Sequence, residues 1–230
     1  MHQPIPRPVL LPTWQKYWTE GHPMQHRAQL LTNRSCWVFD LDGTLTVPVH
    51  DFGFIRQELE IPAHEDILGH LAALSPELAV RRHQRLDEIE RELAAQSIAS
   101  PGAVLLLAYL HSRGDRLGIV TRNSSEVAQI TLEAIGFLQY FAPTQILGRA
   151  DAPPKPDPAG ILLLQEQWGA EAEELVMVGD YLHDLQAGRA AGSLTIHVGR
   201  PDGCRWPEQS DIMVDTLADV AQMLCNADTQ

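Results

Sequence analysis

The sequence predicts an α/β fold, a parallel sheet with helices on both faces, to which a small helical segment is added. After residue 100, short apolar runs alternate with segments of helical periodicity. Strands that alternate with helices in this way form a parallel sheet covered on both sides. Residues 47–100 instead show helical spacing alone, with Pro62 and Pro76 as breaks or first-turn positions. The two patterns together predict a sheet-based core that is interrupted by a helical insert.

These patterns divide the chain into an arm, a core and the insert. The first 34 residues have no clean periodicity, and they suit an irregular arm that packs Trp14 and Trp18 on the body as well as a partly disordered tail. The helical spacing in the insert predicts two or three helices, within residues 51–60, 64–75 and 76–96. The expected division is therefore an arm at residues 1–34, a core at 35–46 and 101–230, and an insert at 47–100.

Each core element has a signal of its own. The apolar run Cys36–Phe39 reads as the first buried strand. Ser124 or Ser125 is suited to begin a helix, and Gly114 and Gly136 are suited to end one. The further expected strands cover residues 116–121, 144–148, 174–180 and 193–199; the expected helices cover 103–114, 124–136, 157–169 and 184–192; residues 211–224 give a final short strand and helix.

Charge and composition limit the partners. The 230-residue chain has a formal net charge of -13 and a sequence pI near 5.1. This acidity argues against a general binder of nucleic acid or anionic membranes, although a local cation would still allow a small phosphorylated substrate. The three cysteines are widely spaced and form no CxxC pattern, and no apolar run is long enough to span a bilayer. These features predict a reduced cytoplasmic protein. The oligomeric state is left open.

The segment FDLDGTLT, residues 39–46, is the strongest chemical signal in the chain. Residues i and i+2 of a strand point to one face, so Asp40 and Asp42 are expected to project together. Two carboxylates on one side repel each other unless a cation or a shared proton intervenes. Gly43 then allows a sharp turn or a close approach of the backbone to a ligand. The segment therefore predicts a metal-dependent polar site at the carboxyl end of a strand.

Four chemically loaded segments fall at or just beyond predicted strand ends, where ligands bind in parallel sheets. Each alone has an ordinary explanation as a helix cap, a turn or a loop residue. Their combination in this order makes coincidence improbable. The segments are residues 40–44 (DLDGT), 121–123 (TRN), 155–158 (KPDP) and 179–184 (GDYLHD).

These four segments resemble the four motifs of the haloacid-dehalogenase-like hydrolases. The resemblance covers about residues 35–224, and the longer string DLDGTLTVPVHDF also looks like a subgroup of small phosphatases of that family from bacteria and plants, similar to phosphoglycolate phosphatases. It implies a Rossmann-like core, a helical cap at residues 47–100 that sets substrate choice, and Mg²⁺-dependent phosphoryl transfer. The expected partner is a small phosphorylated metabolite such as a sugar phosphate, phosphoglycolate or a nucleotide monophosphate.

The family resemblance and the chemistry of carboxylates together predict a role for each aspartate. Asp40 is the expected nucleophile, forming an aspartyl-phosphate, and Asp42 is the expected general acid and then base. Mg²⁺, which prefers oxygen ligands, would bind Asp40 and Asp180 together with the backbone carbonyl of Asp42. Asp184 would be a direct or an indirect ligand.

The remaining site residues are expected to bind phosphate. Thr121 would donate its hydroxyl to a phosphate oxygen, and Lys155 would neutralise developing charge and hold the nucleophile. Backbone N–H groups around Leu41, Asp42 and Arg122 would complete the cradle. The Arg122 side chain is interpreted either as a phosphate or leaving-group contact or as an ordinary surface arginine. Tyr181 stands where the family often has serine. His183 lies between Asp180 and Asp184 and is interpreted as an exposed loop residue in preference to a metal ligand.

Two other functions stay open at this point. A phosphomutase of the same family would use the same aspartyl-phosphate and return the phosphoryl group to a sugar. A catalytically inactive module of the family would bind a partner instead, although the intact set of motif residues weighs against it. A dehalogenase would not need Asp42, and a nucleotide-binding dehydrogenase would need a GxGxxG segment after its first strand, which the chain lacks.

Overall fold

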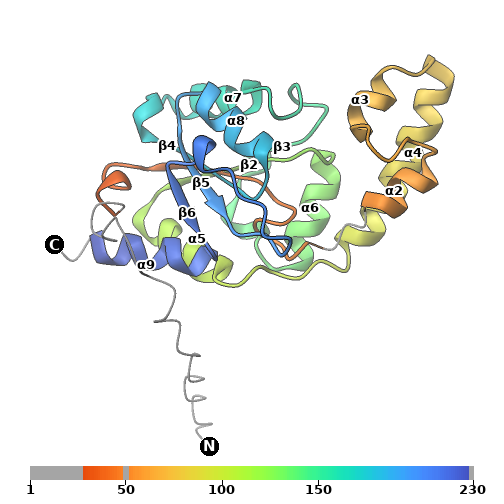
Figure 1. The fold of residues 1–230 in the computed structure, drawn as a ribbon. Helices are drawn as coiled ribbons and strands as arrows, with labels where there is room; N and C mark the ends of the chain where they lie inside the picture. The colour runs from red at the N-terminus through yellow and green to blue at the C-terminus, as the bar shows by residue number, and fades with distance from the viewer. Residues whose placement is uncertain (1–27, 49–51, 228–230) are drawn as a thin grey trace, which may run out of the picture.

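A six-stranded parallel sheet lies at the centre of the molecule (Figure 1). This computed structural model describes residues 28–48 and 52–227, so the predicted packing of Trp14 and Trp18 lies outside the described residues. The strands are β1 (Cys36–Phe39), β2 (Arg116–Val120), β3 (Ile146–Leu147), β4 (Leu175–Gly179), β5 (Leu194–Val198) and β6 (Ile212–Val214). Their order in the sheet is β3-β2-β1-β4-β5-β6, and every pair is parallel. The predicted parallel α/β fold is confirmed.

The sheet order places the first strand at the centre. Cys36 of β1 lies opposite Arg116 of β2 on one side and opposite Leu175 of β4 on the other. The chain builds the sheet outward from β1 in one direction and then from β4 in the other, so the order reverses between these two strands. Ligands of such sheets bind at this switch point, beyond the carboxyl ends of the strands.

Helices cover both faces of the sheet, as its apolar strands require. Alternate residues of β1 point to opposite faces: Trp37 and Phe39 belong to one buried hydrophobic cluster, and Cys36 and Val38 to the other. Figure 1 shows α7 and α8 on one side of the sheet and α5 and α9 on the other. The core helices are α5 (Ala103–Arg113), α6 (Ser125–Ala134), α7 (Ala159–Trp168), α8 (Leu182–Ala190) and α9 (Leu217–Ala227).

Helix ends follow the local signals in most places. Gly114 ends α5 with a left-handed φ of 79°, and the Ser124 side chain begins α6 by accepting a hydrogen bond from the Val127 backbone N–H. Helix α8 begins two residues before the predicted start, because Tyr181 and Asp184 form a capping box there. Short 3₁₀ turns lie at Leu138–Tyr140, Pro143–Gln145, Ala172–Glu174 and Pro207–Gln209. Among the described residues, none of the helices has both the length and the apolar character needed to cross a membrane.

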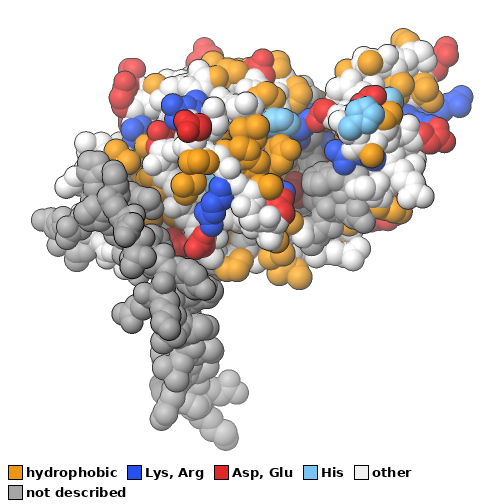
Figure 2. All heavy atoms as spheres, in the orientation of Figure 1, with side chains coloured by type: hydrophobic (Ala, Val, Ile, Leu, Met, Phe, Trp, Pro, Cys, Tyr) orange, Lys and Arg blue, Asp and Glu red, His pale blue; other side chains and the backbone are white. Residues whose placement is uncertain are grey.

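Three helices stand apart from the sheet and form what we call the helical insert (Figures 1 and 2). They are α2 (Phe52–Glu58), α3 (Ile67–Ala72) and α4 (Pro76–Ala94). The insert has a small hydrophobic cluster of its own, separate from the two clusters beside the sheet, with Leu71 and Leu86 at its centre. Such a cluster allows the three helices to pack on one another, as the helical spacing in this region predicts.

The two ends of the insert meet beside the sheet. The Val47 N–H donates to the Ile98 carbonyl and the Ser100 N–H to the Leu45 carbonyl, both at 2.9 Å. Thr46 and Ala99 form an antiparallel bridge between these two bonds. The chain therefore enters and leaves the insert through one short antiparallel pair, directly after β1 and before α5.

Candidate active site

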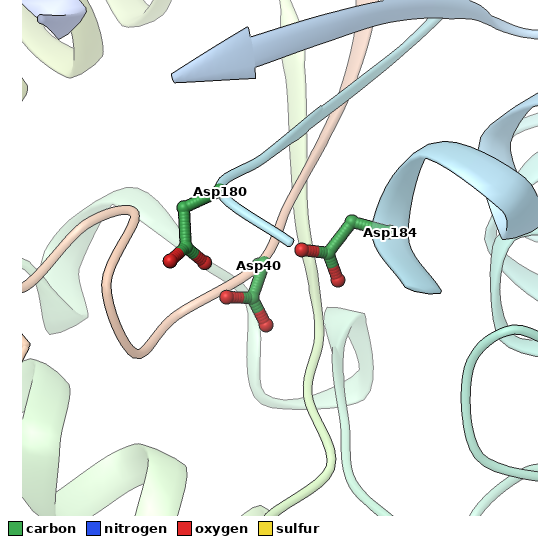
Figure 3. Close-up of side chains that lie close together, drawn as sticks. All are labelled: Asp40, Asp180 and Asp184. Atoms are coloured by element: carbon green, nitrogen blue, oxygen red, sulfur yellow. The ribbon is translucent and has the colours of Figure 1, made fainter. Parts of the chain in front are cut away.

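Three buried carboxylates converge at the switch point of the sheet (Figure 3). Asp40 directly follows β1, Asp180 directly follows β4, and Asp184 lies in the first turn of α8. One oxygen of each lies within 4.8 Å of the others. Because β1 and β4 are neighbours in the sheet, residues that follow them are brought together by the strand pairing itself. Two sequence segments separated by about 140 residues therefore form one acidic cluster.

Lys155 joins two of these carboxylates. Its Nζ lies 2.6 Å from Asp40 Oδ1 and 2.7 Å from Asp184 Oδ1. The lysine side chain has no solvent exposure, and a buried ammonium is retained only where it is paired. The loop between β3 and α7 supplies this lysine. A cation held this way fixes the orientation of the Asp40 carboxylate.

The Asp42 side chain lies outside the acidic cluster. Its Oδ2 accepts a hydrogen bond of 2.7 Å from Asn123 Nδ2, and the Asn123 backbone N–H donates to Thr121 Oγ1 at 3.1 Å. These residues follow β1 and β2, which pair in the sheet. The structure therefore brings Asp42 and Thr121 to the same edge as Asp40. Sequence reasoning placed Asn123 in the chemically loaded segment 121–123 but gave it no role, although it lies only three residues beyond β2.

Two glycines allow the cluster to pack closely. Gly43 has φ +90°, and a Cβ built on it would lie 2.6 Å from Asp180 Oδ2. A Cβ on Gly179 would lie 2.3 Å from the Asp184 Cβ. Both distances are shorter than side chains tolerate, so neither position has room for a Cβ. Gly43 is required for a second reason as well, because its positive φ disfavours other residues. The expected close approach at Gly43 is therefore to another site residue.

Burial and mutual repulsion disfavour ionisation of the carboxylates. Burial raises the pKa of Asp40, the charge of Asp184 raises it further, and Lys155 opposes the rise. Burial also raises the pKa of Asp180, with repulsion from Asp40 as the next cause. For Asp42, burial and the charge of Asp40 raise the pKa to about 7. Burial lowers the pKa of Lys155, but Asp184 and Asp40 outweigh it and keep that pKa above its ordinary value.

The donor set suits a hard divalent cation. All three clustered side chains offer carboxylate oxygens, and they carry more negative charge than Lys155 neutralises. Mg²⁺ prefers such oxygen ligands and keeps several waters beside one or two carboxylates. A cation here would also relieve the repulsion that raises the pKa values of Asp40 and Asp180. The residues present therefore fit the metal that the sequence predicts.

Arg200 is a second cation of the site, and sequence reasoning missed it. It lies on the loop that follows β5, and its Nη1 is 2.6 Å from Asp180 Oδ2. Its guanidinium carbon is 5.2 Å from the centre of the Tyr181 ring. The signal that could have found it is its place two residues past the end of a strand next to β4. Tyr181, the departure from the family pattern, thus supports an arginine at the edge of the site.

A cleft of about 320 Å³ lies between the core and the insert, and Lys155 of the candidate site is part of its lining. Arg122, Lys155 and His183 line its core side, and Asp66, Leu68, Gly69 and Ala72 line its insert side. Arg122 Nη2 donates to both Asp66 oxygens, at 2.6 and 2.8 Å, and Arg122 Nη1 lies 2.9 Å from His183 Nδ1. His183 is half-buried in the first turn of α8, so its interpretation as an exposed loop residue is wrong. Arg122 is part of the cleft, not an ordinary surface arginine.

A more deeply buried arginine joins the core to helix α4. Arg149 Nη1 donates to both carboxylate oxygens of Glu90, at 3.1 and 2.9 Å, and to the Arg122 carbonyl at 3.2 Å. Its Nη2 also bonds to Asp87. Burial raises the pKa of Glu90 to about 7, against the charge of Arg149. Glu90 could have been noticed in the sequence because it shares the helical stripe of Leu86 and Leu93.

Comparisons with known proteins agree with this geometry. The family model for haloacid dehalogenase-like hydrolases matches residues 35–192. A haloacid dehalogenase-like hydrolase domain-containing protein of Arabidopsis thaliana is 31% identical, covering 81% of this chain and 82% of its own. A phosphoglycolate phosphatase of Nitrosococcus oceani is 31% identical over 83% of this chain and 96% of its own. The crystal structure of a hydrolase from Pseudomonas syringae superposes with a TM-score of 0.70 at 25% identity, covering 84% of this chain and 99% of that one.

Proposed function

Because the chain belongs to the haloacid dehalogenase-like hydrolase family, as a phosphatase similar to the phosphoglycolate phosphatases, we propose that it hydrolyses a small phosphate monoester with Mg²⁺ and an aspartyl-phosphate intermediate. One observation carries this proposal. The buried cluster of Asp40, Asp180 and Asp184, joined by Lys155, lies where parallel sheets bind ligands. The residues 47–100 would be the cap, and the cleft beneath the insert would receive the leaving group.

In the first step, a carboxylate oxygen of Asp40 would attack phosphorus while the bond from phosphorus to the leaving alcohol breaks. Lys155, at 2.6 Å from Asp40 Oδ1, would keep the nucleophile oriented. Asp42 would donate its proton to the departing alkoxide, and its raised pKa is compatible with a proton donor near neutral pH. Asn123 would hold the Asp42 carboxyl group in place for this transfer.

In the second step, water would attack phosphorus of the aspartyl-phosphate. Asp42, now ionised, would accept a proton from that water, and the bond from phosphorus to Asp40 would break. Inorganic phosphate would leave, and Asp40 would be ready for another cycle. Thr121 and the backbone N–H groups of Leu41, Asp42 and Arg122 would hold the phosphate oxygens. Bound Mg²⁺, on Asp40, Asp180, the Asp42 carbonyl and directly or indirectly Asp184, would offset the repulsion between the anionic carboxylate and phosphate.

The proposal is tested by phosphate release from a panel of sugar phosphates, phosphoglycolate and nucleotide monophosphates, each with Mg²⁺ and with EDTA. Asp40→Asn serves as the matched variant, because it keeps the shape of the side chain and removes its charge. We expect release that requires Mg²⁺ and that falls by at least about a thousandfold in the variant, while its melting temperature shows that it is folded. Full activity of Asp40→Asn would overturn the mechanism. An isomer in place of free phosphate would identify a mutase.

A further inference from the structure

Arg200 contacts the one carboxylate of the acidic cluster that Lys155 does not join. Lys155 pairs with Asp40 and Asp184, and Arg200 Nη1 lies 2.6 Å from Asp180 Oδ2. The Asp180 side chain is only 5% exposed, so its charge has little water around it. Among the described residues, these two cations share the three carboxylates between them.

The Arg200 guanidinium is held from its other sides as well. Its Nε donates to both oxygens of Asp202, each at 3.1 Å, and its Nη2 donates to Asp202 Oδ2 at 2.9 Å. The Tyr181 ring lies against the guanidinium, in the range of a cation–π contact. Tyr181 in turn packs edge-on against Trp206 of the same loop, with ring centres 5.3 Å apart. An arginine clamped in this way is a fixed part of the site.

We propose that Arg200 is an internal counter-ion that holds Asp180 in the absence of the divalent cation and weakens the binding of that cation. The inference rests on the proposed function, because it takes the acidic cluster as the Mg²⁺ site. The guanidinium occupies one oxygen of a carboxylate that the metal also needs. Two cations that share one carboxylate repel each other, and this repulsion is strong where the surroundings are poorly solvated.

Arg200 therefore stabilises the metal-free protein and lowers its affinity for Mg²⁺. Without it, the buried Asp180 carboxyl group would lose its ion-pair partner, which costs stability until a metal arrives. A purely structural role for the arginine, as an anchor of its loop through Asp202, makes a different prediction. It would lower the stability of the metal-free and the metal-bound protein equally and would leave Mg²⁺ affinity unchanged.

The test uses the full chain and Mg²⁺ alone, without substrate. Wild type, Arg200→Met and Arg200→Gln are melted in EDTA and over a series of Mg²⁺ concentrations, and the Kd for Mg²⁺ is measured by calorimetric titration. Asp202→Asn is the matched control, because it loosens the same loop and leaves the arginine charge in place. We expect both Arg200 variants to melt at a lower temperature than wild type in EDTA. We also expect them to bind Mg²⁺ on the order of tenfold more tightly, and Asp202→Asn to bind it as wild type does.

The outcomes separate this inference from the function on which it rests. Unchanged or weaker Mg²⁺ binding by the Arg200 variants, beside normal binding by wild type, would overturn the role of Arg200 alone. Failure of the wild type to bind Mg²⁺ at all would overturn the metal site and the inference together. Because Arg200→Gln retains hydrogen-bond donors, it gives the answer if Arg200→Met does not fold.

Discussion

Opposite charges hold together both the floor of the candidate active site and the contact between core and insert, but in different surroundings. In this floor, formed by Lys155, Asp40 and Asp184, the lysine comes from the loop between β3 and α7, and its partners come from the end of β1 and the first turn of α8. Water scarcely reaches any of the three side chains. Between core and insert, exposure increases in steps. The Arg149–Glu90 pair is buried, Arg122–Asp66 is half-exposed, and Arg91–Glu126 is largely exposed.

This difference has a consequence for how each region responds to change. The sheet fixes the positions of the floor charges, so the loss of one leaves others buried without partners. Two of the pairs that join the insert to the core use Glu90 and Arg91 of α4, and the third uses Asp66 at the start of α3. The outer pairs can exchange their partners for water at little cost. The floor is therefore expected to fail as a unit, whereas the contact with the insert is expected to weaken pair by pair.

The largest expected effect comes from Lys155→Met. The change leaves two buried carboxylates without their cation, so we expect the free energy of unfolding to fall by about 4 kcal/mol. We also expect the rate of phosphate release to fall roughly a thousandfold. Urea unfolding and a phosphate assay measure the two effects. Arg189→Met is the control, because it removes an exposed pair with Asp211 and should cost less than about 1 kcal/mol. Equal losses in the two variants would show that burial does not set the cost of losing an ion pair in this protein.

A smaller effect is expected from Gly43→Ala, compared with Gly136→Ala. Both glycines have positive φ, but the added Cβ at residue 136 meets no atom within 4 Å, whereas that at residue 43 meets Asp180. Each variant should lose about 1 kcal/mol of unfolding free energy from its backbone angle. Only Gly43→Ala should also lose activity, on the order of a hundredfold, because it displaces a site carboxylate. Equal activity of the two variants would show that this close packing is unimportant.

An effect on stability alone, without a loss of activity, is expected at Glu90, in the buried contact with the insert. Burial raises its pKa from 4.5 to about 7, so the folded state binds this proton more tightly than the unfolded chain does. Its contribution to stability is complete below pH 4.5 and is lost as the pH rises through about 7. Between pH 5 and pH 8, wild type should therefore lose about 2 kcal/mol of unfolding free energy more than Glu90→Gln does.

Denaturant unfolding at the two pH values measures this difference. Glu92→Gln, an exposed change on the same helix, is the control and should follow wild type. Parallel pH profiles of wild type and Glu90→Gln would show that Arg149 offsets burial and leaves Glu90 with its ordinary pKa in the folded protein.

Sequence reasoning identified the site residues that follow strands, because local sequence patterns mark them. Asp40, Thr121 and Asp180 each directly follow an apolar run that becomes a strand, and parallel strands bring their carboxyl ends to one edge. The same logic predicted the parallel sheet and its helices. Lys155 was also identified, but only as part of an ordered set of motifs, since its loop position carries no strand signal.

The rest depends on contacts that local patterns do not encode. Arg200 contacts Asp180 because β5 lies beside β4 in the sheet. The amino-acid sequence of a strand does not reveal which strand lies next to it. The pairing of Arg149 with Glu90 depends on how the insert lies against the core. His183 was interpreted as a loop residue because the capping box at Tyr181, which starts α8 early, was not recognised.

The antiparallel pair at Thr46 and Ala99 has an evolutionary consequence. Because the chain leaves the sheet and returns to it at neighbouring residues, the intervening fifty or so residues are joined covalently to the core at one place. Their other contacts with the core are ion pairs and the packing of α4 against α6. Exchange of that segment for a longer, shorter or unrelated one would leave strand order and the acidic cluster as they are. Under the proposed function, a change of substrate would need new contacts from this segment only, because the groups proposed to cleave the phosphate ester lie in the core.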